Sequence, residues 1–397
     1  MNILLLNAGS SSLKATLMDS KEGKPLATGL ADWAGTVTRY RYAGPDGAER
    51  SEDVPWKGHA AAVERFVHDL TRAEPVALPD LARLAAVGHR VVHGGQFTSS
   101  VQITPDVRSR LSALVDLAPL HNPPSLETLV AAEKVLPGVP HIAVFDTAFH
   151  ATLPPQAYTY AVPESWTRDW GIRRYGFHGL SHAYCARRAA EMLGRPADDL
   201  RLVICHLGHG CSAAAVRGGK SVDTTMGFTP LDGLVMATRS GSIDPGAVLH
   251  VQKRHGLTAE QVETALNRQS GLLGLSGVSA DMRQVLSAAG AGNDRARLAL
   301  EVYTHRVRQA IGALAATLGG IDALVFTAGV GEHSGEVRKR ICAGLEFLGL
   351  DLDADTNATS RTDADIAARG SRGRILIIAT REDVTMLREV VQVLGAK

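Results

Sequence analysis

The sequence predicts an α/β protein built from two similar halves. Short apolar segments typical of β-strands alternate along the chain with segments whose apolar residues recur at helical spacing. Both halves carry the same pattern of a strand, a turn of small residues and a second strand, at residues 3–18 and again at 202–216. We therefore expect a duplicated architecture with a cleft between the halves.

Charge and composition exclude several classes of protein. Lys and Arg number 42 against 41 Asp and Glu, so the net charge of +1 offers no basic field for nucleic acid. No apolar run approaches the roughly 20 residues that span a bilayer, and the N-terminus lacks the basic start of a signal peptide. The four cysteines form no C-x-x-C pair, which favours reduced thiols. We expect a soluble, cytoplasmic protein that binds neither membrane nor nucleic acid.

The first half opens with strands at residues 3–6 and 15–18 around a hydroxyl-rich turn. Residues 20–58 mix Gly, Pro, Asp and Tyr, which predicts irregular β structure. Residues 62–73 carry an apolar stripe and predict a helix, and two more helices are expected from caps near Thr104 and at Ser125. Residues 141–145 predict a strand that ends at Asp146.

The second half continues the alternation. After the strand pair at 202–216, Thr258 and Gln261 form a capping box, and residues 294–318 predict a long helix. A strand at 323–326 runs into a glycine-rich junction, and Ser334 is expected to cap a helix whose stripe extends to Leu348. Residues 374–378 predict the last strand, and the chain ends in a helix with Val384, Leu387, Val391 and Leu394 aligned.

The turn of the first strand pair has the composition of a phosphate-binding loop. Ser10 and Ser12 offer hydroxyls, the turn at Gly9 offers backbone N–H groups, and Lys14 offers a positive charge. The segment is not a P-loop, because the second glycine before the lysine and the Ser or Thr after it are missing. Either strand–turn–strand segment, at 3–18 or at 202–216, could by itself be an ordinary hairpin. The presence of one in each half favours nucleotide binding.

Four further residues are candidates for chemistry. Arg90 and Arg239 lie among glycine-rich turns, where a guanidinium can grip an anion through two hydrogen bonds. Asp146 ends a strand, where α/β sites gather, although it could instead cap a helix. His178 lies in a glycine-flanked turn, and a structural role is its alternative. His178 and His182 lack the Glu of an H-E-x-x-H motif, so no zinc site is expected.

Four motifs resemble the acetokinase family, which belongs to the superfamily of sugar kinases, Hsp70 and actin. The motifs occupy residues 6–14, 173–182, 226–231 and 326–332, and the resemblance runs from residue 2 to about 394. It implies two duplicated actin/Hsp70-like (ribonuclease H-like) domains with a nucleotide cleft between them. It also implies an N-terminal domain at 1–148, a C-terminal domain at 149–382 and a C-terminal helix at 383–397 that returns to the first domain. The family implies a cytoplasmic homodimer that transfers phosphoryl from ATP to acetate with Mg²⁺, or Mn²⁺ in its place.

The resemblance also assigns residues. It implies catalytic roles for Arg90, Asp146, His178 and Arg239, and metal binding by Asn7 and Glu382. It implies a pocket for the acid formed by Val92, Leu120, His121, Phe177 and Pro230, together with Arg90. Besides Ser10, Ser12 and Lys14, the residues expected to bind ATP are His206, Gly208, His209, Gly210, Asp281, Met282, Arg283, Gly329, Val330, Gly331 and His333.

The chemistry of the reaction agrees with these assignments. A carboxylic acid is already ionised at neutral pH, so the nucleophile needs no strong base, and the difficulty is the approach of two anions. We expect Arg90 to hold the carboxylate, Arg239 and His178 to hold the transferring phosphoryl group, and Glu382 to bind Mg²⁺ through water. Asp146 is expected to orient waters on the metal or the His178 ring. Direct in-line transfer is expected rather than a phosphorylated enzyme.

Four positions depart from the family pattern: His209 and His333 stand where Asn is usual, Ser242 replaces Asp, and Arg381 replaces Asn. We expect these four residues to affect the choice of phosphoryl donor and the reaction rate more than the type of reaction. Propionate or butyrate kinase is the closest alternative, since one methylene changes binding by only about 1 kcal/mol. A variant of the enzyme that uses pyrophosphate as the phosphoryl donor is a second alternative. A non-catalytic nucleotide switch would not need both arginines, and a sugar kinase would need a polar pocket with a general base.

Overall fold

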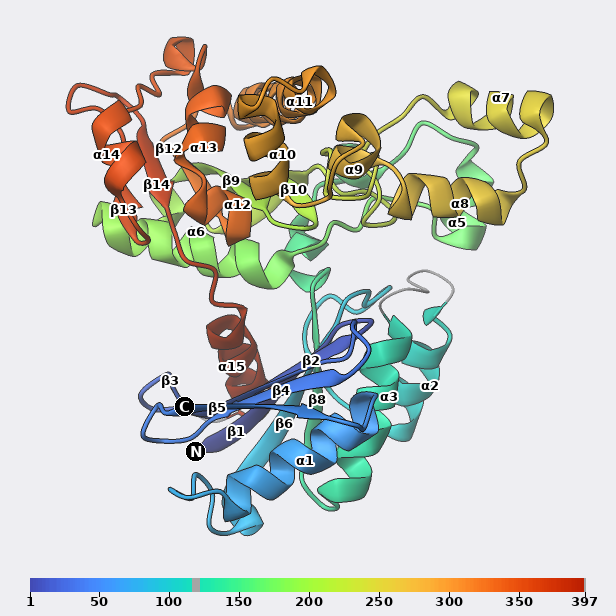
Figure 1. Cartoon of the computed structure of the whole chain (residues 1–397), viewed down its shortest axis with the longest axis vertical. Helices are drawn as coiled ribbons and strands as arrows, with labels where there is room; N and C mark the ends of the chain where they lie inside the picture. Colours follow the sequence, from blue (N-terminus) through green and yellow to red (C-terminus); the bar gives the residue numbers. More distant parts are fainter. Residues whose placement is uncertain (116–121, 396–397) are drawn as a thin grey trace. The chain divides into compact units, whose positions relative to one another are not determined.

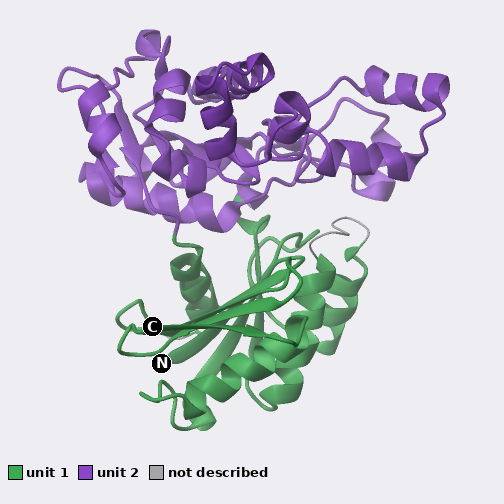
Figure 2. Ribbon diagram, in the orientation of Figure 1, with its two compact units in different colours: residues 1–149, 381–397 green, residues 150–380 purple. Residues whose placement is uncertain are grey.

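The computed structural model describes residues 1–115 and 122–395 and divides into two compact units. Unit 1 contains residues 1–149 and the C-terminal segment from 381, and unit 2 contains residues 150–380 (Figure 2). Leu120 and His121, two of the residues expected to bind the acid, lie outside the described residues. No helix in the described ranges combines the length and the apolar character that a membrane crossing needs.

Unit 1 is a mixed sheet with helices against it. Its strands are β1 (Asn2–Ala8), β2 (Ser12–Asp19), β3 (Lys24–Asp32), β4 (Thr38–Ala43), β5 (Glu49–Val54), β6 (Leu84–Val91), β7 (Val101–Gln102) and β8 (His141–Phe145). They lie in the order β5-β4-β3-β2-β1-β6-β8-β7. Its helices are α1 (His59–Arg72), α2 (Pro105–Ser112), α3 (Asn122–Val135) and α15 (Glu382–Val393).

Unit 2 repeats this plan with more helices. Its strands are β9 (Arg201–Leu207), β10 (Cys211–Arg217), β11 (Lys220–Thr224), β12 (Ala323–Thr327), β13 (Ala364–Asp365) and β14 (Arg374–Ile377), in the order β11-β10-β9-β12-β14-β13. Its helices are α4 (Pro155–Tyr158), α5 (Glu164–Trp170), α6 (Gly179–Leu193), α7 (Pro245–His255), α8 (Ala259–Arg268), α9 (Gly271–Ser276), α10 (Met282–Gly290), α11 (Asp294–Leu318), α12 (Ala328–His333), α13 (Gly335–Cys342) and α14 (Ala354–Thr359) (Figure 1).

The two sheets share one topology, which confirms the duplicated α/β fold. In unit 1, β3, β2 and β1 pair antiparallel in succession, and β1, β6 and β8 then pair parallel. In unit 2, β11, β10 and β9 pair antiparallel, and β9, β12 and β14 pair parallel. In each unit the carboxyl ends of three parallel strands therefore meet at one edge, where ligands bind in open α/β sheets.

Buried apolar side chains hold each sheet to its helices. In unit 1, α1 buries Val63, Phe66, Val67 and Leu70 against the sheet and packs beside α3 (Figure 1). Helix α15 packs on β1, β6 and β8, and Gly88 of β6 lets it approach, because a methyl group there would lie 2.7 Å from Val390 Cγ2. The chain end is thus built into unit 1, next to the strand that carries Arg90.

Most predicted elements are confirmed. Both hairpins form, Thr104 caps α2, the capping box at Thr258 is present, and α11 has the predicted bounds. Ser334 accepts a hydrogen bond from the Val337 N–H and caps α13, as expected.

Four predicted details are wrong. The 20–58 segment is a regular antiparallel meander, β3 to β5, rather than irregular structure. Helix α3 begins at Asn122, so Ser125 lies inside it and is no cap. Helix α13 ends at Cys342, and the stripe continues through a short 3₁₀ turn at Glu346–Leu348. In α15 Leu387 is buried as predicted, but the other buried apolar residues are Met386 and Val390, while Val384, Val391 and Leu394 are only partly buried.

Four buried histidines predict that stability falls in acid. Burial lowers the pKa of His89 and His182 well below 6.5, that of His141 below 6.5 and that of His150 to about 4. The native state holds these rings neutral while the unfolded chain binds protons below pH 6.5. Each ring therefore removes up to about 1.4 kcal/mol of stability per pH unit between pH 6.5 and its native pKa. Urea unfolding midpoints measured from pH 8 to pH 4.5 are expected to fall steeply below pH 6.5.

The control for this prediction is His255→Gln, because His255 is exposed at the end of α7. Its pH profile is expected to match that of the unchanged protein, whereas His89→Asn is expected to flatten the profile. A midpoint that stays constant from pH 6.5 to 4.5 would contradict the argument.

Candidate active site

The carboxyl edge of the unit 1 sheet gathers four predicted residues. Asn7 lies near the end of β1, Arg90 near the end of β6, Asp146 directly after β8 and Glu382 at the start of α15. Arg90 Nε and Nη2 donate to the two oxygens of Asp146 at 3.1 and 2.5 Å, and Nη1 donates to Asn7 Oδ1 at 3.2 Å. Arg90 Nη1 also lies 3.6 Å from Glu382 Oε2. Residues from the ends of β1 and β8 and from the start of α15 thus hold the Arg90 guanidinium in one orientation.

Electrostatics make this cluster tightly coupled. Burial disfavours the charge on Arg90, but Asp146 and Glu382 outweigh it and raise the pKa of the guanidinium. Burial raises the pKa of the Asp146 carboxyl, which is 1% exposed, and Arg90 opposes that rise. The cluster therefore holds a permanent positive charge that is matched by carboxylates.

The first predicted phosphate loop lies in the same unit. Gly9 N–H donates to the Ser12 carbonyl at 2.8 Å, and the Gly9 carbonyl lies 2.9 Å from His59 Nε2, so both ends of the turn are held. Ser10 and Lys14 are exposed, and Lys14 stands opposite Asn7 in the β1–β2 ladder. Val92, just after β6, is buried. The loop therefore presents its hydroxyl and amine groups near the same strand end as Asn7.

His178 of unit 2 is held by an unusual backbone and by hydrogen bonds. It precedes α6 with a φ of 58°, in the left-handed region that non-glycine residues rarely adopt. Gly176 just before it has a φ of 76°, and a methyl group there would lie 2.7 Å from the His150 ring. His178 Nδ1 lies 2.9 Å from Ser212 Oγ, and its ring stacks on that of His206 with centroids 4.1 Å apart.

Arg239 converges with His178 beside one glycine. A methyl group built on Gly210 would lie 3.2 Å from His178 Nε2 and 3.7 Å from Arg239 Nη1. Arg239 Nη1 also donates to the Pro230 carbonyl at 3.2 Å, and burial lowers the pKa of this guanidinium. Phe177, the other predicted apolar residue here, is buried at 1% exposure. Two groups that can donate hydrogen bonds to an anion thus face the same small space.

This geometry predicts that Gly210→Ala slows catalysis. The added methyl group needs His178 to move by a few tenths of an ångström, and small displacements of this kind cost on the order of tenfold in rate. Steady-state kinetics are expected to show a kcat lowered about tenfold. The matched control is Gly312→Ala in the middle of α11, where the methyl group meets no atom within 4 Å and kcat is expected to stay unchanged. Equal kinetics for the two variants would contradict the placement.

A cavity of about 1050 Å³ lies in unit 2 beside this pair. Most residues predicted to bind ATP from this unit line it, namely Gly208, His209, Asp281, Met282, Arg283, Gly329, Val330 and His333. Gly331 does not line it; it is buried against β12, and a methyl group there would lie 3.4 Å from the Phe326 carbonyl carbon. His206 and Gly210 also stay outside the lining, on the side of His178. Gly208 and His209 therefore line the cavity while the next residue, Gly210, lies beside His178 and Arg239.

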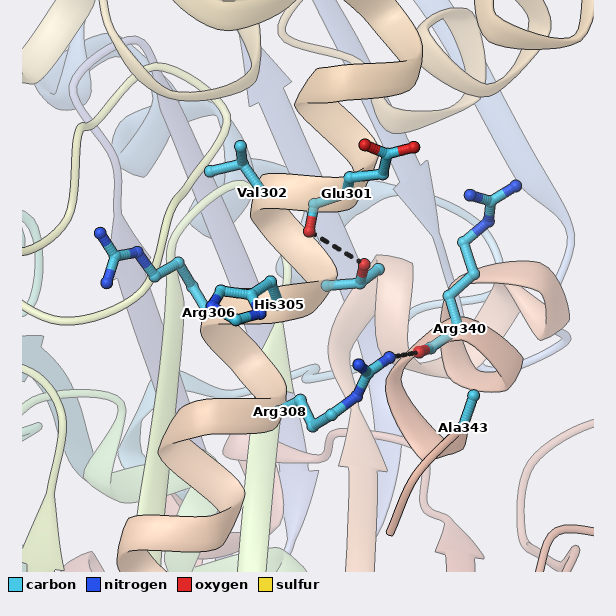
Figure 3. A pocket seen from close by; sticks show the side chains of 8 residues that line it. Glu301, Val302, His305, Arg306, Arg308, Arg340 and Ala343 are labelled. Carbon is cyan, nitrogen blue, oxygen red and sulfur yellow. Dashed lines mark hydrogen bonds between the residues drawn. The ribbon is translucent and has the colours of Figure 1, made fainter.

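A second cavity of about 660 Å³ contains none of the predicted residues. It lies between α11 and α13 and is lined by three arginines and His305 (Figure 3). All three arginines are already engaged, and Arg306 donates to Gln309 Oε1 at 3.3 Å. Arg308 donates to the carbonyls of Arg340 and Ile341, and Arg340 pairs with Glu336 at 2.6 Å. The Arg308 contacts tie α11 to α13, whereas the Arg340 pair lies within α13.

Sequence reasoning missed the residues that support these groups. Ser212 and His182 hold His178, and Ser181 lies 2.8 Å from His206 Nδ1. Glu332 accepts hydrogen bonds from the N–H groups of Ala328 and Thr380, both at 2.9 Å. Ser212 lies just past the glycine loop at 208–210. That position is the sequence feature that could have marked it as part of the site.

Comparisons with known proteins agree with the family resemblance found in the sequence. The model of the acetokinase family matches residues 2–388. The chain belongs to the acetokinase family. It is 46% identical over 398 residues to the acetate kinase of Methanosarcina acetivorans, covering 99% of this chain and 97% of that protein. It is 47% identical to the acetate kinase of Caldanaerobacter subterraneus subsp. tengcongensis, covering 98% of each.

Solved structures of this acetokinase fold are similar over the whole chain. The acetate kinase of Porphyromonas gingivalis has a TM-score of 0.91 and 39% identity, with 99% of each chain covered. A propionate kinase from Francisella tularensis has a TM-score of 0.90 and 39% identity, with 98% of each chain covered. One is named for acetate and the other for propionate, and this chain is 39% identical to each.

The structure shows the contacts made at the four positions that depart from the acetokinase pattern. His209 and His333 line the large cavity, and burial, then Arg239, lowers the pKa of His209. Ser242 donates to Asp232 at 2.6 Å and accepts from the Gly233 N–H at 3.0 Å, which closes the loop that leads to Arg239. Arg381 donates to both oxygens of Asp383, so a carboxylate compensates the added positive charge beside Glu382.

Proposed function

We propose that this protein catalyses the reversible transfer of the γ-phosphoryl group of ATP to acetate, giving acetyl phosphate and ADP. The observation that carries the proposal is the loop at 208–210. Its first two residues line a cavity large enough for a nucleoside triphosphate, and its third lies beside His178 and Arg239. A phosphate chain that follows this loop out of the cavity would reach both donors.

Different charged groups are proposed to bind the two anions that react, acetate and the phosphoryl group of ATP. We infer that Arg90 binds the acetate carboxylate, since its charge is permanent and Asp146 fixes its orientation. Arg239 and His178 donate hydrogen bonds to the oxygens of the transferring phosphoryl group, whose charge they stabilise in a water-poor site. Acetate is ionised before it arrives, so the residues position and neutralise rather than remove a proton, which favours direct in-line transfer.

Apolar residues accompany these groups. Val92 in unit 1 and Phe177 and Pro230 in unit 2 are proposed to contact the methyl group of the acid, as are Leu120 and His121. Such contacts distinguish acids by only about 1 kcal/mol per methylene, so propionate and butyrate are the natural competitors. The 39% identity to a propionate kinase of the same fold favours testing them first.

The oxygen donors at the unit 1 edge fit Mg²⁺. Glu382 offers a carboxylate and Asn7 an amide oxygen, and no group of three His, Cys, Asp or Glu within residues 1–115 and 122–395 could hold a metal. Such a sparse set suits an ion that keeps most of its waters. When bound with ATP, Mg²⁺ would neutralise phosphate charge, and we propose that Glu382 and Asn7 hold it through water.

The test is acyl phosphate formation, trapped by hydroxylamine as the hydroxamate. Reactions contain ATP and Mg²⁺ with acetate, propionate, butyrate or glycerol, and parallel reactions contain pyrophosphate as donor. We expect hydroxamate from acetate with ATP and none with glycerol. Absence of product with every acid and both donors would overturn the proposal, and a higher kcat/KM with propionate would reassign the preferred acid.

We further propose a cytoplasmic homodimer that assembles through unit 2. Helix α7 buries no residue, and Ile243 and Leu249 beside and on it are 46% and 52% exposed. The four cysteines are buried as free thiols, which suits a reducing compartment. Light scattering is expected to give twice the mass of one chain, and Leu249→Glu to shift it toward one. A single-chain mass for the unchanged protein would contradict the dimer.

A further inference from the structure

One serine hydroxyl in unit 2 lies between two histidine rings. Ser212 Oγ is 2.9 Å from His178 Nδ1 and 2.8 Å from His182 Nε2. Ser212 on β10 and His182 on α6 are fully buried. The His182 N–H donates to the His178 carbonyl at 3.0 Å, so the first turn of α6 brings both rings to the same hydroxyl. The three side chains form a chain that ends at the active site.

A hydroxyl has one hydrogen, so it can donate to one ring and must accept from the other. The surroundings of His182 decide the direction. Its Nδ1 has no hydrogen-bond partner among the described residues, and burial keeps the ring neutral. A proton on Nδ1 would leave a buried N–H donor unsatisfied, which is costly, whereas a bare ring nitrogen is tolerated better. His182 therefore carries its hydrogen on Nε2 and donates it to Ser212.

Ser212 then donates its own hydrogen to His178 Nδ1. A neutral His178 must in consequence carry its hydrogen on Nε2, the nitrogen that faces Gly210. The ring cannot easily turn to escape this assignment, because it stacks on His206, which is itself held by Ser181. Ring orientation and hydrogen placement are thus fixed by separate contacts.

We propose that Ser212 and His182 are positioning residues that select the Nε2–H tautomer of His178. This inference rests on the proposed function in one respect: the phosphoryl oxygens are the acceptors of that N–H. With the hydrogen on Nε2, His178 donates to an incoming phosphoryl oxygen. With the hydrogen on Nδ1, the same nitrogen would present a lone pair to the anion and repel it.

The test begins with a spectroscopic signature that needs no substrate. Two-bond ¹H–¹⁵N spectra of the full-length protein labelled with ¹⁵N-histidine distinguish the two neutral tautomers, and His178→Phe identifies the His178 signals by their loss. We expect the Nε2–H pattern for His178 in the unchanged protein. In Ser212→Ala the pattern is expected to shift toward Nδ1–H, and in Ser212→Thr, which keeps the hydroxyl, to stay.

Kinetics supply the second readout. Ser212→Ala is expected to lower kcat about 100-fold, the lower end of the range for loss of one aligned donor, while KM for ATP and acetate changes less than about threefold. His182→Gln keeps an N–H near the former Nε2 and is expected to retain most of kcat, whereas His182→Leu is expected to resemble Ser212→Ala. If Ser212→Thr does not fold, the His182 pair gives the same comparison.

The matched control is Ser221→Ala. Ser221 on β11 is equally buried and its Oγ lies 2.8 Å from His150 Nδ1, so the variant also removes a buried Ser–His hydrogen bond. Its effect on the melting temperature is expected to equal that of Ser212→Ala, with kcat and the His178 spectrum unchanged. Equal kinetic losses in the two variants would assign a general structural role and overturn the proposal.

Two further results would overturn it: an Nδ1–H pattern for His178 in the unchanged protein, or an unaltered pattern in Ser212→Ala. Failure of the proposed function looks different. In that case the protein forms no acyl phosphate, yet the His178 spectrum still changes in Ser212→Ala.

Discussion

Arg90→Met is expected to abolish acyl phosphate formation and to lower the free energy of unfolding by about 3 kcal/mol. The first effect follows from losing the charge that we assign to the acetate carboxylate. The second follows from Asp146, which is 1% exposed and takes two hydrogen bonds from the Arg90 guanidinium. Without that partner a carboxylate stays buried without its compensating charge, which costs far more than the loss of a surface ion pair.

The double variant Arg90→Met/Asp146→Leu separates the two effects. Replacing both members of a buried pair with apolar residues is often neutral for stability, so the double variant is expected to regain most of the lost 3 kcal/mol or so. Its activity is expected to stay absent. Urea unfolding and the hydroxamate assay on the same preparations measure both quantities.

An exposed pair in the same unit provides the control. Arg39 on β4 lies 3.3 Å from Asp53, and both side chains are more than half exposed. Arg39→Met is expected to change stability by less than about 1 kcal/mol and to leave activity intact. If Arg90→Met retained activity, the acetate would need another cation. If the double variant were no more stable than the single one, the cost would not come from Asp146.

Local sequence signals predicted elements well where both ends carried a marker. The bounds of α11 follow from Asn293, which caps its first turn through the Ala296 N–H, and from Gly319, which ends it in the left-handed conformation. Helix α13 was predicted too long because its apolar spacing continues past Cys342. Ala343 leaves the helix with a ψ of 116° and Gly344 has a φ of 87°, so the stripe follows a turn instead of a helix.

The meander at β3 to β5 was missed for a different reason. Almost all of β5 is exposed, so its sequence lacks the alternation of apolar and polar residues that marks a half-buried strand. Pairing with β4 over its full length forms the strand. Backbone ladders of this kind leave little trace in side-chain patterns.

The candidate site shows the same limit. Sequence reasoning made Arg90, His178 and Arg239 candidates because each lies in a short segment rich in glycine turns. The partners of these residues are distant in sequence: Asp146 is 56 residues from Arg90, and Ser212 is 34 residues from His178. Only the strand register and the start of α6 bring them together. The compensation of Arg381 by Asp383 is local, but spacing alone does not show that the two side chains pair.

Arg239→Met is expected to lower kcat about a thousandfold without loss of stability. The rate effect is that of removing an arginine from a phosphoryl-transfer site, where such a group contributes about 10³ to 10⁵. The stability effect differs in sign from that of Arg90, because burial lowers the pKa of Arg239 whereas Asp146 raises that of Arg90. An apolar side chain of similar length removes the cost of burying this charge, which offsets the loss of the hydrogen bond from Nη1 to the Pro230 carbonyl.

The backbone that carries Arg239 is expected to survive this change. The Met236 N–H donates to the Arg239 carbonyl at 3.1 Å, and Gly271, with a φ of 63°, packs so closely that a methyl group there would lie 2.8 Å from that carbonyl oxygen. These contacts do not involve the guanidinium. Arg239→Lys, which keeps a charge but loses the planar fork, is expected to recover only part of kcat.

Kinetics and thermal unfolding of Arg239→Met, Arg239→Lys and the control Arg268→Met test the argument together. Arg268 is exposed at the end of α8, and its replacement is expected to change neither quantity. A melting temperature of Arg239→Met equal to or above that of the unchanged protein, with kcat lowered about a thousandfold, would fit a residue held in an unfavourable environment for catalysis. A melting temperature lowered together with kcat would instead make Arg239 a structural support for the loop, and the phosphoryl group would need a different cation.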